Sequence, residues 1–125
     1  MSALLFVSPF FIVADLQESV DFYVDKLGFE LHYIAEAEAH CFTMIGRGPV
    51  SLMLKSSGQP VPNHTRYECA VWDAHIGVAD PDALFKEFRS KGVSFNQDLP
   101  DNTDNLRGFS VTAPNGYRLF FARPT

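Results

Sequence analysis

The sequence predicts an α+β fold built from two β-α-β-β-β units. One observation is the stretch 13–29, in which Asp15 stands before an apolar pattern of helical spacing and Gly28 stands after it. An Asp carboxylate caps the first turn of a helix, and a Gly adopts the left-handed conformation that ends one. The other observation is that 80–93 repeats this plan and ends at Gly92. Two copies of one strand-helix-Gly-strand unit indicate a fold made of two repeats.

The first half of the chain has the pattern of a strand, a helix and three further strands. Glu18 stands three residues after Asp15, as a capping box requires. A loop rich in Ser, Gly and Pro over 56–66 ends this half. The expected elements are a strand over 4–14, a helix over 16–27, a hairpin of strands 29–35 and 40–45 with its turn at 36–38, a tight turn at 46–48 and a strand over 50–55.

The second half repeats this order. Asp80 is the expected cap, Pro81 occupies the first helical position, and Asn115-Gly116 is a strong hairpin signal. The expected elements are a strand over 67–79, a helix over 81–91, a strand over 93–97, a polar loop over 98–106, a strand over 108–112, a turn at 114–116 and a strand over 117–122. Each helix covers one face of its sheet, so the other faces need cover from each other or from a ligand.

Length and charge narrow the classes of function. We expect one domain over 1–125, with a module over about 1–55, a linker over 56–66 and a second module over 67–125. The net charge of −5 argues against nucleic acid as a partner, because phosphate binding needs clustered Lys and Arg. No leader pattern or long apolar run is present, so we expect a cytoplasmic protein with no membrane partner. Cys41 and Cys69 lack CxxC spacing and are expected to be reduced thiols.

Two stretches of the sequence resemble the signatures of a known family. Residues 13–29 read Val-Ala-Asp-Leu-Gln-Glu-Ser-Val-Asp-Phe-Tyr-Val-Asp-Lys-Leu-Gly-Phe, and residues 113–120 read Ala-Pro-Asn-Gly-Tyr-Arg-Leu-Phe. Both resemble the vicinal-oxygen-chelate superfamily, also called the glyoxalase/bleomycin-resistance/dioxygenase group. The resemblance implies two βαβββ modules whose sheets curl into an incomplete barrel around a cavity, usually in a homodimer.

Within the superfamily, the chain resembles the antibiotic-binding, bleomycin-resistance-like branch. Residues 50–54 resemble its fourth strand, and residues 61–65 resemble its linker. Pro9 matches the point where the N-terminal strand of that branch crosses to the partner subunit, although such a Pro equally marks an edge strand. Arg107, in the stretch 105–109, resembles an Arg of that branch. The Trp and Gly that accompany it there are absent here, which puts bleomycin itself in doubt as the ligand.

The resemblance also identifies four positions at which the superfamily's enzymes hold a divalent metal, typically with His and Glu. These positions fall on Ser8, Met53, Asp73 and Phe120. Only Asp73 offers a donor that suits such an ion, since a hydroxyl is a weak ligand, a thioether suits soft metals and a phenyl ring has no donor. A shift in the alignment would place His75 at the third position and leave the others unchanged. We therefore expect no metal and no cofactor.

The same positions are expected to line a small-molecule site. By strand alternation Ser8 shares a face with Phe10. His40, His75 and Asp73 are a candidate acid-base set, and the alternative is that both histidines are wall residues with one hydrogen bond each. The candidate ligand-binding residues are Ser8, Phe10, His40, Met53, Asp73, His75, Arg107 and Phe120.

The leading hypothesis for function is metal-independent binding of a small apolar or aromatic molecule, with sequestration of an antibiotic as one form of it and no reaction catalysed. The alternative is a lyase, isomerase or dioxygenase of the same superfamily that uses Asp73, His75 or His40. The polar region Asp98 to Leu106 is either a lid over the site or a solvated turn.

Overall fold

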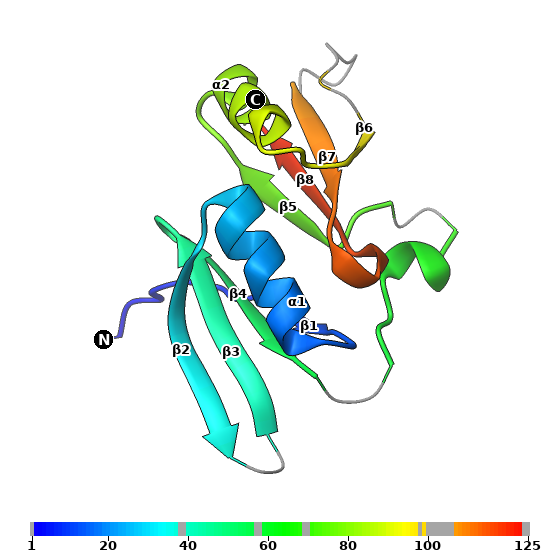
Figure 1. Ribbon diagram of the computed structural model, residues 1–125. Helices are drawn as coiled ribbons and strands as arrows, with labels where there is room; N and C mark the ends of the chain where they lie inside the picture. Colours follow the sequence, from blue (N-terminus) through cyan, green and yellow to red (C-terminus); the bar gives the residue numbers. More distant parts are fainter. Residues whose placement is uncertain are drawn as a thin grey trace. The chain divides into compact units, whose positions relative to one another are not determined.

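Each half of the chain folds around its own four-stranded mixed sheet (Figure 1). The computed structural model describes residues 2–37, 40–56, 59–68, 71–97, 99 and 107–123, with the backbone alone at 36–37 and 40–41. The described chain divides into two units, Met1–Pro60 and Val61–Thr125, and each is described by itself.

The first unit contains one helical segment and four strands. In its sheet the strand order is β1-β4-β3-β2, with β1 parallel to β4 and the other pairs antiparallel. The helical segment runs from α into π geometry without a break. The elements are β1 (Phe10–Ile12), α1 (Leu16–Asp21), the π-helix η1 (Phe22–Lys26), β2 (Glu30–Ala37), β3 (His40–Arg47) and β4 (Val50–Lys55).

The second unit has the same topology, with strand order β5-β8-β7-β6 and β5 parallel to β8. Its elements are the 3₁₀ turn η2 (Asn63–Thr65), β5 (Ala74–Gly77), α2 (Pro81–Ser90), β6 (Phe95–Gln97), β7 (Gly108–Thr112), the turn η3 (Pro114–Gly116) and β8 (Arg118–Ala122). The prediction of an α+β fold with two βαβββ modules is therefore confirmed.

The capping residues work as the sequence predicts. The carboxylate Oδ1 of Asp15 accepts the backbone N–H of Glu18 at 3.1 Å, and Oδ1 of Asp80 accepts that of Ala83 at 3.1 Å. Gly28 has a φ of 73° and Gly92 a φ of 76°, the left-handed region that ends a helix with little strain only at Gly. These four positions place both helical segments between their flanking strands.

The two units also agree in strand register. The backbone N–H of Val13 donates to the carbonyl of Lys55 at 2.9 Å, and that of Val78 donates to the carbonyl of Ala122 at 2.8 Å. Val13 and Val78 are therefore equivalent positions. It follows that the parallel pair Phe10 and Met53 in the first sheet corresponds to His75 and Phe120 in the second.

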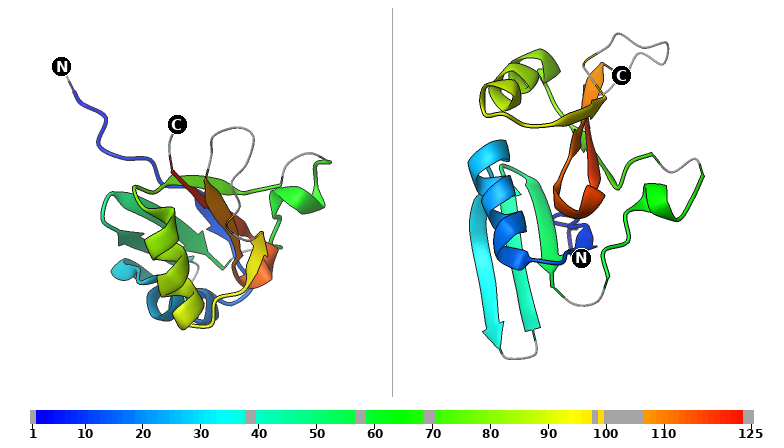
Figure 2. Two further views of the ribbon diagram at one scale, coloured as in Figure 1. Left: turned by 90° about the horizontal axis from the view of Figure 1, so that it is seen from above. Right: turned by 45° about the vertical axis from the view of Figure 1, so that its right-hand side comes forward.

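Each helix packs against one face of its own sheet (Figure 2). In β4 the side chains of Leu52 and Leu54 are buried, whereas Ser51, Met53 and Lys55 are half-buried, as alternation along a strand requires. In the second unit the rings of Phe109 and Phe121 both contact Phe88 of α2. The opposite face of each sheet thus carries the positions predicted to line a site.

The first strand is shorter than the sequence predicts. We expected it over 4–14, but only Phe10–Ile12 pair with a neighbouring strand, namely Met53–Lys55 of β4. Apolar residues form a strand only where their backbone groups find partners. Residues 2–9 lie outside any helix or strand. The expected turn at 36–38 is also wrong, because β2 extends to Ala37.

The fifth strand is shorter as well. We expected it over 67–79, and the structure confines it to Ala74–Gly77. In the turn before it, Thr65 Oγ1 donates to the carbonyl of Pro62 at 2.7 Å, and the backbone N–H of Tyr67 donates to the carbonyl of Asn63 at 3.0 Å. Tyr67, the first residue of the predicted strand, is therefore part of this turn.

Candidate functional site

Three ring side chains meet on the face of the second sheet opposite α2. Phe121 faces α2, so its neighbour Phe120 points to the other side of β8. There Phe120 stacks on Trp72, with centroids 3.9 Å apart and planes inclined by 14°. His75, the partner of Phe120 in the parallel pair, contacts it edge-on at 5.4 Å. We call Trp72, His75 and Phe120 the aromatic cluster.

The polar atoms of the aromatic cluster are not all satisfied. Trp72 Nε1 is buried and has no hydrogen-bond acceptor among the residues that the structure describes. A buried donor without a partner costs about 1–3 kcal/mol, so such groups in proteins call for an explanation. His75 is exposed, which leaves one side of the cluster open to solvent. Phe120 is buried, with 1% of its surface exposed, and Trp72 is half-buried. The cluster is therefore accessible from the side of His75 and Trp72.

Asp73 lies beside the aromatic cluster, yet its carboxylate bonds to the backbone. Oδ1 accepts the N–H of Asn63 at 2.7 Å, and Oδ2 accepts the N–H of Arg118 at 2.9 Å. Asn63 Nδ2 also donates to the carbonyl of Trp72 at 3.2 Å. These bonds join Asn63 of the linker to the residues at the start of β5 and β8. Asp73 therefore acts as a structural brace, a role that its sequence context does not reveal.

Two more contacts fasten the same segment. His64 Nε2 lies 2.9 Å from the carbonyl oxygen of Gly116, and the N–H of Val61 donates to the hydroxyl of Tyr117 at 3.2 Å. Residues 61–64 are thus held against the hairpin that contains η3. His64, which the sequence suggests to be a linker residue, belongs to this brace.

In the first unit the predicted residues Ser8, Phe10 and Met53 are neighbours. Ser8 Oγ lies 3.2 Å from Ser51 Oγ, and the N–H of Met53 donates to the carbonyl of Pro9 at 2.8 Å. Phe10 pairs with Met53 in register and leaves 50% of its side chain exposed. The alternation that groups these residues on one face is consistent with the half-burial of Ser51 and Met53.

The residues at the superfamily's metal positions do not fit a metal ion. Met53 and Phe120 bring no donor suited to a hard divalent ion, and both oxygens of Asp73 already accept backbone hydrogen bonds. Among the described residues, no group of three or more His, Cys, Asp or Glu is arranged to hold a metal. The donor chemistry of these positions gives no basis for a metal-dependent step.

Arg107 lies elsewhere on the second unit. Its guanidinium donates hydrogen bonds to the carboxylate of Asp82 in the first turn of α2. Nη2 lies 2.7 Å from Oδ1, and Nε lies 3.1 Å from Oδ1 and 3.2 Å from Oδ2. Hydrogen bonding from Arg107 holds the pKa of Asp82 below its usual value. A role for Arg107 in ligand binding stays a prediction.

The structure places some of the predicted site residues in contact, gives others a structural role, and does not describe the side chain of one. In the second unit it brings His75 and Phe120 into contact and places Asp73 in the brace beside them. The side chain of His40 lies outside the described residues, and so does the predicted lid or turn from Asp98 to Leu106, apart from Leu99. Sequence reasoning missed Trp72, because alternation counted back from His75 assigns Trp72 to the other face. Only an irregular backbone before Ala74 brings both side chains to Phe120.

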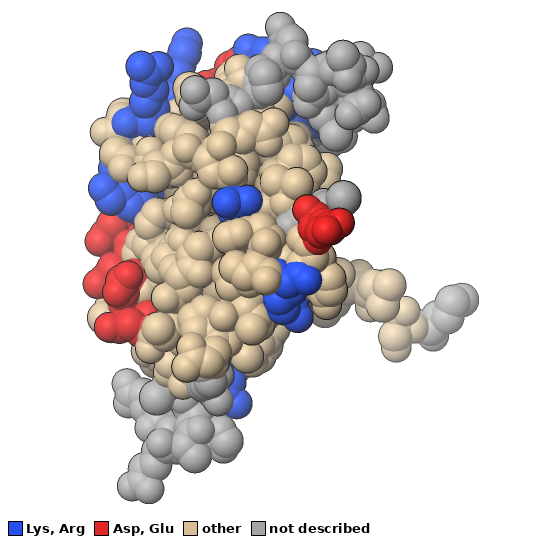
Figure 3. Space-filling view, turned by 90° about the vertical axis from the view of Figure 1, so that its right-hand side faces the viewer, with Lys and Arg blue, Asp and Glu red and all other residues tan. Residues whose placement is uncertain are grey.

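The surface drawn in Figure 3 is mostly uncharged. Nucleic-acid binding uses a stripe of clustered Lys and Arg. The absence of nucleic acid as a partner stays a prediction. None of the helices in the described part of the chain is long and apolar enough to cross a bilayer.

Comparison with known proteins places this fold in a family. Residues 6–121 match the Glyoxalase/Bleomycin resistance protein/Dioxygenase superfamily. Two similar solved structures are TnmS3, an antibiotic binding protein from Streptomyces sp. CB03234 (20% identity, TM-score 0.74, covering 100% of this chain and 98% of that one), and a bleomycin-binding protein from Streptomyces verticillus complexed with copper(II)-bleomycin (27% identity, TM-score 0.70, covering 100% of each). No curated protein matches the chain. With the family matching nearly the whole length, the chain belongs to the glyoxalase/bleomycin resistance/dioxygenase superfamily.

Proposed function

We propose that this protein binds a planar aromatic small molecule without a metal, using the aromatic cluster as the stacking surface. The observation that carries the proposal is the stacked pair Trp72 and Phe120, with the open His75 at its edge. Stacked and edge-on ring pairs favour a further flat ring by about 0.5–1.5 kcal/mol each beyond area burial.

The comparisons support a drug-like ligand. TnmS3 is described as an antibiotic binding protein, and the Streptomyces verticillus protein was solved with copper(II)-bleomycin. The second is similar to this chain over the full length of both. We infer that the ligand of this chain is an antibiotic or a related aromatic metabolite, held without chemical change. Ser8, Phe10, Met53 and Arg107 remain proposed contacts.

The chain has a single tryptophan, so its fluorescence reports on the aromatic cluster alone. We expect an aromatic antibiotic that binds here to quench or shift the Trp72 emission. We expect His75→Ala to weaken binding three- to tenfold, because one ring contact is worth about 0.5–1.5 kcal/mol. Titration calorimetry on the wild type and the variant measures this change.

His32→Ala is the matched control, since His32 is an exposed strand histidine of the other unit. We expect it to bind like the wild type. A ligand that binds with no change in Trp72 emission and with equal affinity for His75→Ala would place the site elsewhere and contradict the proposal.

The enzyme alternative, with Asp73, His75 or His40 as acid or base, has less support. A catalytic acid or base needs to reach the substrate, and both oxygens of Asp73 are bonded to the backbone of Asn63 and Arg118. Turnover of a glyoxalase-type substrate that depends on an added divalent metal would favour the enzyme over the binding protein.

We also propose that the protein is a homodimer in which the N-terminal arm, residues 2–9, packs on the partner. Its apolar side chains are exposed to an unusual degree, at 101% for Leu4 and 84% for Val7. A contiguous exposed apolar segment marks an interaction surface. Exchange of this arm is what the resemblance to the antibiotic-binding branch implies, and Pro9 stands at its end.

A further inference from the structure

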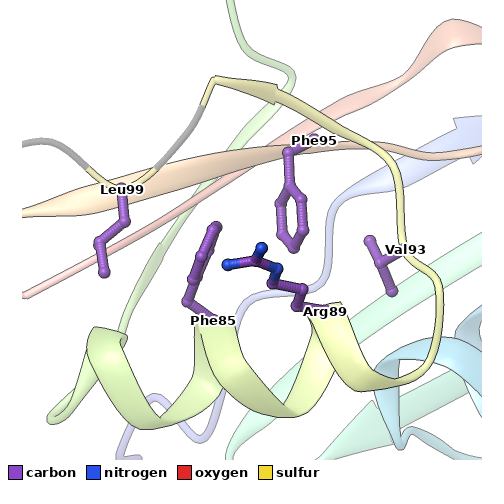
Figure 4. A pocket seen from close by; sticks show the side chains of 5 residues that line it. All are labelled: Phe85, Arg89, Val93, Phe95 and Leu99. Atoms are coloured by element: carbon purple, nitrogen blue, oxygen red, sulfur yellow. The ribbon is translucent and has the colours of Figure 1, made fainter.

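A pocket of the second unit lies on the helix side of its sheet, between α2 and β6 (Figure 4). Its volume is about 510 Å³, within the usual range for a small-molecule site. It is lined by Phe85 and Arg89 of α2, Val93, Phe95 of β6 and Leu99. The aromatic cluster lies on the opposite face of the sheet, so the two places are separate.

The wall of this pocket is aromatic, and its rings pack against the buried ring of Phe109. The rings of Phe85 and Phe95 are 4.6 Å apart, and each contacts Phe109 edge-on, at 5.3 Å and 5.6 Å. Phe109 is fully buried, whereas Phe85 and Phe95 are half-buried. The pocket is therefore an exposed extension of the aromatic core and offers ring surface that the fold does not cover.

Arg89 is the one charged residue among the described residues that line the pocket. Figure 4 shows the side chain of Arg89 extending from α2 toward the side chains of Phe85 and Phe95. The two carboxylates of α2 are already engaged, Asp82 with Arg107 and Glu87 with Lys91. Among the described residues, none forms an ion pair with Arg89. An anion is the group that this guanidinium is suited to bind.

We propose that this pocket binds a small aromatic anion, a carboxylate or sulfonate carried on one or two fused rings. The rings lie against Phe85 and Phe95, and the anionic group pairs with Arg89. The pocket's chemistry differs from that of the aromatic cluster, which contains no Arg or Lys. The proposal therefore does not rest on the function proposed above.

Naphthalene-2-carboxylate is the probe, and its neutral carboxamide is the matched control compound. We expect the carboxylate to shift the backbone amide resonances of Phe85, Val93 and Phe95. We expect Arg89→Gln to weaken its binding about tenfold or more, because a charge-assisted hydrogen bond is lost. Arg89→Lys, which keeps the charge, should recover part of the affinity, and binding of the carboxamide should be the same in all three proteins.

Two further variants test whether the carboxylate occupies this pocket and no other part of the surface. Lys86→Gln removes an exposed charge from the same helix but no pocket wall, and we expect it to bind like the wild type. Trp72→Phe alters the aromatic cluster, and we expect the carboxylate to shift the amide resonances of Phe85, Val93 and Phe95 in this variant as in the wild type. The proposal is overturned if the carboxylate does not shift these resonances at millimolar concentration, if Arg89→Gln binds it as well as the wild type, or if Trp72→Phe abolishes the shifts.

Discussion

The role of Asp73 depends on two backbone groups that are distant in sequence. Its carboxylate accepts N–H groups from Asn63, ten residues earlier, and from Arg118, forty-five residues later. Burying those N–H groups without an acceptor would be costly, and a carboxylate is the strongest acceptor available to them. Asp73 is the one metal-competent residue in the superfamily pattern, and here it stabilises the fold.

This arrangement predicts a large effect of Asp73→Ala on stability. Losing two charge-assisted hydrogen bonds should lower the free energy of unfolding by about 2–4 kcal/mol. Urea unfolding measures the change. Asp25→Ala is the control, because Asp25 is exposed, and it should cost less than about 0.5 kcal/mol. Equal stabilities for the two variants would mean that the hydrogen bonds of Asp73 do not stabilise the fold.

Single residues also show where sequence reasoning stops. The positions of Met53, Phe120 and His75 follow from the motifs, and their lack of metal donors is visible in the sequence. Trp72 could not be predicted to stack on Phe120, because alternation holds only inside a regular strand and β5 begins at Ala74. The pairing of Arg107 with Asp82 joins residues distant in sequence and has no local signal.

At the scale of elements, the ion pair between Arg107 and Asp82 ties the start of β7 to the first turn of α2. Hydrogen bonds from Arg107 lower the pKa of Asp82 in the folded protein. A carboxyl whose pKa is lower in the folded than in the unfolded state stabilises the fold at pH values above its unfolded pKa. That contribution is lost as the pH falls below about 4.

We therefore expect Asp82→Asn to reduce the loss of stability on acidification. Thermal unfolding of the wild type and the variant at pH 7 and at about pH 3 measures it, and the wild-type advantage should shrink at the lower pH. The comparison between the two proteins cancels the titration of all other carboxyl groups. A constant difference across this range would mean that the pair contributes no pH-dependent stability.

Strand boundaries show which elements the sequence determines. β4 and β7 match their predicted ranges, because both are inner strands with partners on each side and their apolar patterns are continuous. β1 and β5 are the edge strands that run parallel to β4 and β8, and both are shorter than predicted. The length of an edge strand is set by its one neighbour, which a local pattern does not reveal.

At the scale of the whole chain, the repeat is what made the fold predictable. The caps, the terminating glycines and the Asn115-Gly116 turn are local signals, and each appears where the structure needs it. The pocket beside α2 was not predictable, because its wall combines residues of α2, residues of β6 and Leu99, which follows β6 in the chain.

The proposed homodimer has a consequence for the stability of the whole molecule. In a homodimer each folded chain is bound by a second folded chain, and this binding stabilises the folded state. More chains are paired at higher protein concentration, so the melting temperature rises with concentration. We expect this increase between about 1 µM and about 100 µM, and we expect deletion of residues 2–7 to abolish it. Replacing Leu4, Leu5 and Val7 by Ser keeps the length of the arm and should have the same effect. A melting temperature that does not depend on concentration would contradict the dimer.

The π-helical turn η1 records a difference in length between the two repeats. The distance in sequence from Asp15 to Gly28 is one residue longer than that from Asp80 to Gly92. A π turn is what an α-helix forms when one residue is inserted, because the extra residue widens a single turn and leaves the rest of the helix in phase. The extra residue of the first module is accommodated at Phe22–Lys26, and both modules have the same strand register around helical segments of unequal length.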